Sequence, residues 1–225
     1  METTMYDNLL QLPLFQGMSK DEFTSIIERV KLHFVTIKAG ETIARQGQPG
    51  NQLIYLLSGE IIAHTKDENN LYAISETFGE THVIEPYSLF GMRPYYTATY
   101  YAKKEAKLLC IDKSFIFSEL INYEIFRINY FNILSNRCQS THQKLWDTYP
   151  STLKGKFIGF LQERCQKASG EKALHITMED LGNLIDETRI NVSRMLNDLH
   201  EKGIIQLKRK EIYIPELEKL IQEKA

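Results

Sequence analysis

Residues 188–200 combine side-chain types that can read the edges of DNA bases with the spacing of an amphipathic helix. At about 100° per residue, one side of such a helix is apolar and is predicted to pack inward; it carries Val192, Met195, Leu196 and Leu199. The other side carries Arg189, Ile190, Ser193, Arg194 and Asn197, with Asn191 on the flank. Arginine can donate two hydrogen bonds to guanine, asparagine can pair with adenine, and isoleucine can contact the methyl group of thymine. A solvated helix face would have the same pattern, so the neighbouring segments must decide between the two interpretations.

A shorter helix is predicted directly before this one, and the two would form a helix-turn-helix. Thr177 is a candidate N-cap for the first helix, and Thr188 is one for the second. Gly182 would let the two helices approach closely. Asp186 falls at the tight turn between them, where it can adopt a left-handed backbone conformation better than most residues. The core-facing residues predicted for the first helix are Leu181, Leu184 and Ile185.

Two β-rich runs, at 203–207 and 212–214, follow the second helix and predict a hairpin wing. Three adjacent cations lie between them, and cations of this kind bind backbone phosphates without reading sequence. Helix, turn, helix and basic wing together indicate binding to double-stranded DNA. The candidate DNA contacts are Thr177, Thr188, Arg189, Ile190, Asn191, Ser193, Arg194, Asn197, Lys208, Arg209 and Lys210.

The first 112 residues have the turn spacing of a β-sandwich or jelly roll. After a capping-box pattern at Ser19 and Glu22, which predicts a helix start, turn signals recur about every ten residues with short β-rich runs between them. Residues 53–57 and 60–63, separated by Ser58-Gly59, are predicted to pair as a hairpin, and 107–111 is predicted as the last strand.

From Asp112 to about Asp147 the chain has helical periodicity and contains no glycine or proline. One stripe of this predicted long helix carries Ile121, Ile125, Ile128, Phe131 or Asn132, Ser135, Cys138, His142 and Leu145. Such a helix could lie against a barrel on one side and against a symmetry mate on the other. With a hinge at 148–151, we expect an α+β protein with a β-barrel sensor domain over 1–112, a dimerisation helix and hinge over 113–149, and a winged helix-turn-helix over 150–225.

Composition is that of an ordinary globular protein. Of the 225 residues 43% are hydrophobic and 25% charged, and the net charge is −2. Residues 1–150 hold 14 basic and 17 acidic side chains and residues 151–225 hold 13 and 12, so DNA binding must depend on where the cations lie. No apolar run approaches the roughly 18 residues of a membrane span, and the first residues lack the basic start of a signal peptide. We therefore expect a cytoplasmic protein without a membrane partner.

In its motifs the chain resembles the cAMP receptor protein/FNR (Crp/Fnr) family of bacterial transcription regulators. The segments that carry the resemblance are 178–182, 188–196 and 199–205 in the winged helix, and the run from Phe34 through Gly40, Gly47, Tyr55, Leu57 and Gly59 to Ile62 in a cyclic-nucleotide-binding-type jelly roll. It covers essentially the whole chain. The resemblance implies a homodimer that reads a pseudo-palindromic site with half-sites about one helical turn apart, and it implies RNA polymerase as a further partner. Ile190 stands where cAMP-responsive members carry Glu, which implies a different operator.

The cassette that binds the cyclic phosphate in cAMP-responsive members departs from the family pattern here. The acid that binds the sugar is replaced by Met92 and the arginine that binds the phosphate by Tyr96. Because a cyclic phosphate needs a cation or a nest of amide donors, cAMP is not the expected effector; Arg93 is a possible substitute cation, and the pocket is either empty or holds another small molecule. The candidate effector residues are Gly91, Met92, Arg93, Tyr96, Thr97, Ser140 and Thr141.

Other kinds of site have little support in the sequence. Cys110, Cys138 and Cys165 form no CxxC pair, and no cysteine precedes Cys110, so we expect neither a disulfide framework nor an iron–sulfur cluster or other metal site. The histidines have no spacing that favours haem. We find no nucleophile–base motif or phosphate loop and expect no catalytic residues and no enzyme activity. The alternative function is a small-ligand or haem-binding sensor that acts on a protein partner.

Overall fold

The computed structural model describes residues 9–149 and 151–223. The start of the chain, used above to argue against a signal peptide, and Pro150 of the expected hinge lie outside the described residues. The chain divides into two compact units. The first runs to Ile61 and resumes over Phe78–Thr141, and the second contains Ile62–Thr77 and continues from His142.

The first unit is built from antiparallel strands. One sheet has the order β1-β8-β3-β6, and β2 pairs with β7 outside that sheet. Before the strands, helix α2 (Lys20–Arg29) begins with the predicted capping box, in which the amide of Glu22 donates to Ser19 Oγ and the amide of Ser19 donates to the Glu22 carboxylate. The strands of the unit are β1 (Leu32–Ile37), β2 (Thr42–Ala44), β3 (Gln52–Ser58), β6 (Val83–Ile84), β7 (Thr99–Ala102) and β8 (Ala106–Asp112).

The predicted hairpin between 53–57 and 60–63 is wrong. Both runs are strands, β3 and β4 (Ile61–Lys66), but they lie in different sheets. Strand β3 already pairs along one edge with β8 and along the other with β6, so neither edge is left for β4. Gly59, between the two strands, has a positive φ of 97°, and a side chain there would collide with the carbonyl oxygen of Glu105.

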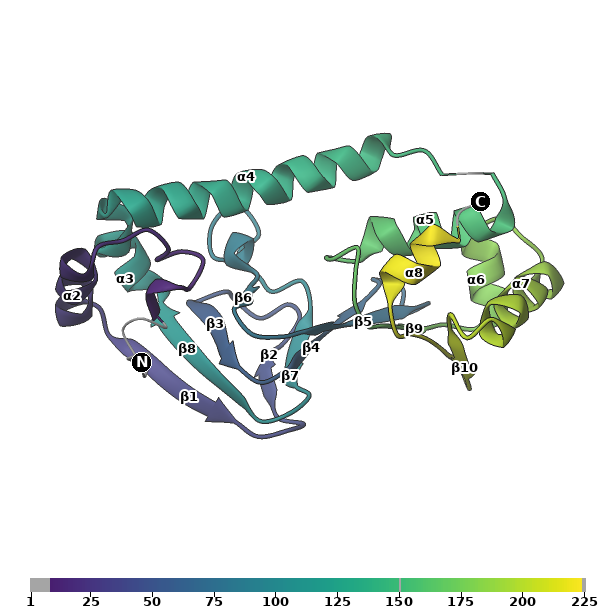
Figure 1. Ribbon diagram of the computed structural model, residues 1–225, viewed down its shortest axis with the longest axis horizontal. Coiled ribbons are helices and arrows are strands. Elements are labelled where there is room, and N and C mark those ends of the chain that lie inside the picture. Colours follow the sequence, from purple (N-terminus) through teal and green to yellow (C-terminus); the bar gives the residue numbers. More distant parts are fainter. Residues whose placement is uncertain (1–8, 150, 224–225) are drawn as a thin grey trace. The chain divides into compact units, whose positions relative to one another are not determined.

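The predicted helix between 112 and 147 is broken once. The chain forms α3 (Lys113–Ser118), a 3-10 turn η2 (Leu120–Asn122) and then α4 (Glu124–Trp146), the long helix in Figure 1. Leu120 and Phe126 are both fully buried in one apolar core, yet six residues of continuous helix would point them in directions about 120° apart. The turn and the extended backbone at Tyr123 bring both side chains to that core.

The second unit contains the helix-turn-helix and one sheet with the order β10-β11-β9-β5-β4. Figure 1 shows β5 (Ala73–Phe78) beside β9 (Lys172–His175), and the register pairs Ala73 with His175 and Glu76 with Lys172. Ile74 of β5 is buried in the same apolar core as the helices that follow. Those helices are α5 (Leu153–Arg164), α6 (Met178–Leu184), α7 (Arg189–Glu201) and α8 (Leu217–Gln222), with β10 (Gln206–Lys208) and β11 (Glu211–Ile214) as the wing.

The expected α+β class is therefore confirmed, with antiparallel sheets and a winged helix-turn-helix. Among the described residues, no helix has both the length and the apolar character needed to cross a bilayer.

Candidate nucleic-acid interface

Two capped helices and a strained turn position the candidate DNA-binding surface. Thr177 Oγ1 accepts a hydrogen bond of 3.1 Å from the amide of Asp180 at the start of α6, and Thr188 Oγ1 accepts one of 3.2 Å from the amide of Asn191 at the start of α7. Asp186 has a φ of 54° at the turn. A Cβ atom at Gly182 would lie 2.7 Å from the carbonyl oxygen of Glu187, so glycine allows the turn to pack directly on α6.

The sides of α7 divide as the residue pattern predicts. Val192, Met195, Leu196 and Leu199 are buried in the core of the unit. On the other side Ser193 is partly exposed, Ile190 is 63% exposed, and the remaining exposed residues are Arg189, Asn191, Arg194 and Asn197. Arg189, Ile190, Ser193 and Arg194 line one shallow depression. The structure therefore gathers two guanidinium groups, an aliphatic side chain and small polar groups on one accessible helix face. In α6, Leu184 differs from expectation: it is 37% exposed and lines a surface groove.

The wing adds cations beside the start of α7. A groove of about 390 Å³ lies between them and is lined by Arg189, Lys208 and Lys210, together with Glu179 and Glu211. Lys208 Nζ lies 2.8 Å from Glu211 Oε1, and this hydrogen bond is the main reason why the pKa of Lys208 is raised. Arg209 and Lys210 are exposed at the hairpin turn. The wing thus carries one cation that is already paired within the protein.

An ion pair that the sequence pattern did not reveal supports the turn. Lys156 Nζ of α5 lies 3.0 Å from Glu187 Oε1 and also donates to the carbonyl oxygen of Asp186 at 3.1 Å. The hydrogen bond from Lys156, followed by one from the side chain of Asn191, holds the pKa of Glu187 below its usual value. The Glu187 carboxylate therefore orients the side chain of Asn191 at the start of α7. The two residues are four positions apart, so the sequence could have indicated this contact.

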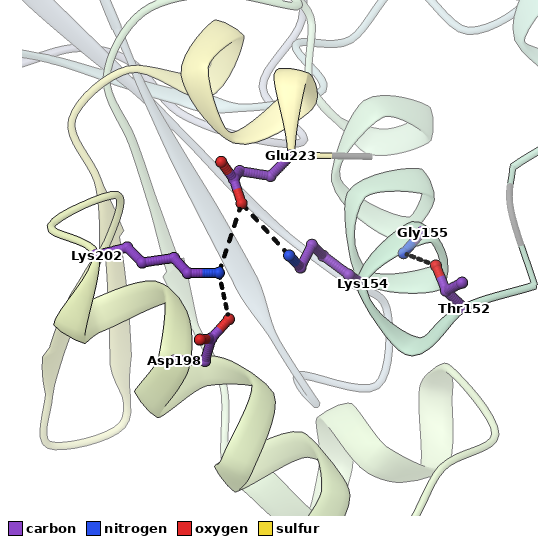
Figure 2. A network of polar contacts seen from close by, with 6 residues as sticks. All are labelled: Thr152, Lys154, Gly155, Asp198, Lys202 and Glu223. Atoms are coloured by element: carbon purple, nitrogen blue, oxygen red, sulfur yellow. Dashed lines mark hydrogen bonds and ion pairs between the residues drawn. The ribbon is translucent and has the colours of Figure 1, made fainter. Parts of the chain in front are cut away.

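Charged side chains also fix the other end of α7. Figure 2 shows Lys202 between Asp198, at 3.0 Å, and Glu223, at 3.9 Å, with Lys154 of α5 3.4 Å from the same Glu223 oxygen. Thr152 caps α5 in the same view by accepting from the amide of Gly155 at 3.1 Å. These contacts join α5, α7 and the segment after α8. They hold the C-terminal end of α7 against the rest of its unit.

The candidate effector residues lie in the first unit, on a loop and on α4. Met92 is fully exposed, and Gly91, Arg93, Thr97, Ser140 and Thr141 are also exposed. Tyr96 is buried and its hydroxyl donates to the carbonyl oxygen of Gln52 at 3.3 Å; burial, and then the nearby charge of Glu85, raise its pKa to about 12. The structure brings Thr97 into contact with Glu85, at 2.8 Å between Thr97 Oγ1 and the carboxylate. Sequence reasoning missed Glu85.

The described residues hold no group of three or more His, Cys, Asp and Glu side chains arranged to bind a metal ion. Cys110 and Cys165 are buried and Cys138 is exposed, and all are free thiols. Burial, with Asp112 nearby, raises the pKa of Cys110 to about 11; burial, with Glu76 nearby, raises that of Cys165 to about 12.

Comparison with known proteins matches both halves of the chain. Residues 34–123 match the cyclic nucleotide-binding domain and residues 155–223 match the Crp-like helix-turn-helix domain. The chain is 23% identical over 228 residues to the CRP-like cAMP-activated global transcriptional regulator of Mycobacterium tuberculosis, with 96% of this chain and 98% of that protein covered.

Solved structures share the fold. The catabolite activator protein of Thermus thermophilus has a TM-score of 0.52 and 18% identity, covering 95% of this chain and 100% of that one. The sensor domain of the transcriptional regulator DNR from Pseudomonas aeruginosa has a TM-score of 0.50 and 22% identity, covering 64% of this chain and 97% of that one. Because both matched domains occur in order and span most of its length, the chain belongs to the Crp/Fnr family of DNA-binding transcription regulators.

Proposed function

We propose that the chain is a homodimeric regulator that reads a pseudo-palindromic operator through α7. The accessible polar face of that helix is the observation that carries the proposal: Arg189 and Arg194 are exposed, and Ile190 is 63% exposed, while the opposite face is buried. In this proposal Arg194 and Arg189 donate to guanine, Asn191 and Asn197 pair with adenine, Ile190 contacts a thymine methyl group, and Ser193 donates to a base edge.

Phosphate contacts complete the interface. Thr188 and the free amides at the start of α7 meet one phosphate. Thr177 at the start of α6 meets another through its backbone amide, because its hydroxyl already donates to Asp180 Oδ2 at 2.5 Å. Arg209 and Lys210 of the wing bind the backbone beside the groove, while Lys208 contributes less because Glu211 already pairs with it at 2.8 Å. Such contacts supply affinity that falls steeply with salt.

The second copy binds along α4. One side of this helix buries Phe126 and Tyr130 in the first unit, and the other leaves Ile128 44% and Phe131 54% exposed. Apolar side chains repeated on an exposed helix face are typical of helix pairing. In the proposed dimer each copy contributes one α7 helix, and the two helices read half-sites in successive major-groove segments.

The division of labour follows the proposed domains: a sensor over 1–112, a dimerisation helix and hinge over 113–149, and the DNA-binding domain over 150–225. We propose an effector other than cAMP for the sensor, and contact with RNA polymerase once the dimer is bound. As a regulator of transcription, the protein would act beside the chromosome, in the cytoplasm.

The test is selection of an operator from random double-stranded DNA, followed by fluorescence anisotropy at several salt concentrations. We expect an inverted-repeat consensus and an affinity that falls by roughly 10³-fold or more between low and moderate salt, because several phosphates are neutralised. A chain that acts on a protein partner would instead enrich no consensus from the random pool.

A further inference from the structure

The carboxylate of Glu85 is buried in the first unit, where the residue is 2% exposed. Five donors among the described residues point at it. Oε2 accepts from Ser88 Oγ at 2.6 Å and from the Thr97 amide at 2.7 Å. Oε1 accepts from Thr97 Oγ1 at 2.8 Å, from the Ala98 amide at 3.0 Å and from the Tyr100 hydroxyl at 3.1 Å.

These donors come from two separate parts of the chain. Ser88 ends the 3-10 turn η1 (Pro86–Ser88), and Thr97, Ala98 and Tyr100 lie at the start of β7 and just before it. All five donors are neutral amides or hydroxyls. A buried carboxylate is costly unless hydrogen bonds replace its hydration, and donors gathered in this way make that replacement.

The backbone of Glu85 supports the same conclusion. It has a φ of 35° and a ψ of 59°, a left-handed conformation that a residue with a long side chain seldom adopts. A strained backbone of this kind persists where surrounding contacts hold the residue in place. At Glu85 these contacts are the hydrogen bonds to its carboxylate.

We propose that these amides and hydroxyls form an oxyanion-binding site for a small carboxylate, and that the chain fills it with Glu85 as a built-in ligand. Each carboxylate oxygen receives one backbone N–H, from Thr97 or from Ala98. A hydroxyl can turn to face a different partner, whereas a backbone N–H cannot. The site therefore selects a group with two hydrogen-bond acceptors, one facing each backbone N–H. Any external anion finds these donors occupied in the natural protein.

A vacated site gives a direct test with acetate as the probe. Glu85→Ala removes a CH₂–COO⁻ group, which acetate matches in size and charge. Glu85→Gly removes more and also accepts the positive φ. We expect sodium acetate, compared with sodium chloride at equal ionic strength, to raise the thermal midpoint of both variants by roughly 5 °C in a saturable manner. The natural protein should show no such rise.

Glu85→Gln is the matched control, because it keeps the volume and removes the charge. In either orientation, the glutamine amide turns its NH₂ group toward the backbone N–H of Thr97 or of Ala98, and two donors then face each other. The thermal unfolding midpoint of the Glu85→Gln variant should therefore fall below that of the natural protein. Acetate should not restore it, since the site is still filled. Adding Thr97→Val to Glu85→Gly removes one donor and should raise the acetate concentration needed for half of the effect severalfold.

Several results would overturn the proposal. One is a folded Glu85→Gly protein that responds equally to acetate and to chloride; another is a Glu85→Gln protein as stable as the natural one. A variant that does not fold in sodium chloride is refolded in sodium acetate. Folding in acetate alone supports the proposal, and failure to fold in either salt contradicts it.

Discussion

Glu76 and Lys172 lie opposite each other on β5 and β9 and form a nearly fully buried ion pair, with 3.1 Å between the ammonium and the carboxylate. Their side chains are 4% and 1% exposed. The carboxylate of Glu76 also accepts from the amides of Gln166 and Lys167, at 2.7 and 3.2 Å, and Lys172 donates to the carbonyl oxygen of Ser169 at 2.8 Å. The pair thus joins the segment 62–77 to the loop and strand that precede the helix-turn-helix.

Removing one partner of this ion pair should destabilise the folded protein. Lys172→Met is expected to lower the free energy of unfolding by about 3–5 kcal/mol, because it leaves the Glu76 carboxylate buried without its cation. Chemical unfolding followed by circular dichroism measures the change.

The matched control is Lys202→Met, which removes an exposed lysine that lies 3.0 Å from Asp198 and 3.9 Å from Glu223. Exposed pairs contribute little, so this variant should unfold almost as the natural protein does. Equal effects of the two substitutions would mean that burial does not set the strength of the Glu76–Lys172 pair.

Two histidines in the second unit predict a dependence of stability on pH. His64 Nδ1 and His175 Nε2 lie 2.9 and 3.3 Å from the same Ser75 hydroxyl, and the rings are 5.7 Å apart. Burial first, then His175 and Lys66, lower the pKa of His64. The unfolded chain, with a pKa of about 6.5 at this position, therefore binds the proton more readily than the folded one. Stability is full above pH 6.5 and is lost as the pH falls through the folded pKa. Thermal unfolding from pH 8 to pH 5 should show this loss.

His64→Gln isolates the effect, because glutamine has no proton to gain in this range. The variant should lose less stability than the natural protein on acidification. Parallel curves for the two proteins would assign the pH dependence to other groups.

The DNA-binding half could be predicted in detail because its signals are local. Thr177 and Thr188 cap the helices that follow them, Asp186 adopts its left-handed turn, and four apolar residues of α7 are buried, as their spacing indicates. Each of these features depends on residues within a few positions along the chain. The exposed Leu184 is the exception in this region.

Features that depend on distant partners could not be predicted in this way. Strands β3 and β4 satisfy every local rule for a hairpin, and only the occupied edges of β3 exclude it. Likewise, nothing near β5 indicates that it pairs with a strand about one hundred residues later. Glu85 is inconspicuous in the sequence, because its donors at Thr97 and Ala98 come from another segment.

Gly182→Ala should destabilise the helix-turn-helix. The added Cβ would lie 2.7 Å from the carbonyl oxygen of Glu187, a backbone atom that cannot move without shifting the turn. We expect a loss of about 1–3 kcal/mol, as for other overpacked sites. Gly79→Ala is the control, because nothing lies within 4 Å of a Cβ there and its φ is not positive; it should leave stability unchanged or slightly raised. A tolerated Gly182→Ala would show that the turn can relax.

Phe131→Asp should separate the proposed dimer. Phe131 is 54% exposed on the side of α4 away from the buried Phe126, and a carboxylate within a helix pair would be desolvated without a partner. Size-exclusion chromatography with light scattering should report the monomer mass. Phe117→Ser, at a side chain that is 75% exposed on α3, is the control and should keep the dimer mass. A monomeric natural protein would contradict the assembly itself.

Base reading and phosphate binding should separate by mutation. Arg194→Ala is expected to cost about 1–3 kcal/mol of binding to the operator and to leave affinity for random DNA almost unchanged, because a lost base contact affects only the matched sequence. Arg209→Ala and Lys210→Ala should instead weaken binding to both DNAs equally, and each should reduce the salt slope by about one. Lys208→Ala should reduce it less, since Glu211 already holds that cation at 2.8 Å. Anisotropy titrations with operator and scrambled duplexes measure both quantities. If Arg194→Ala left the ratio of the two affinities unchanged, α7 would have to face the groove through a different set of side chains.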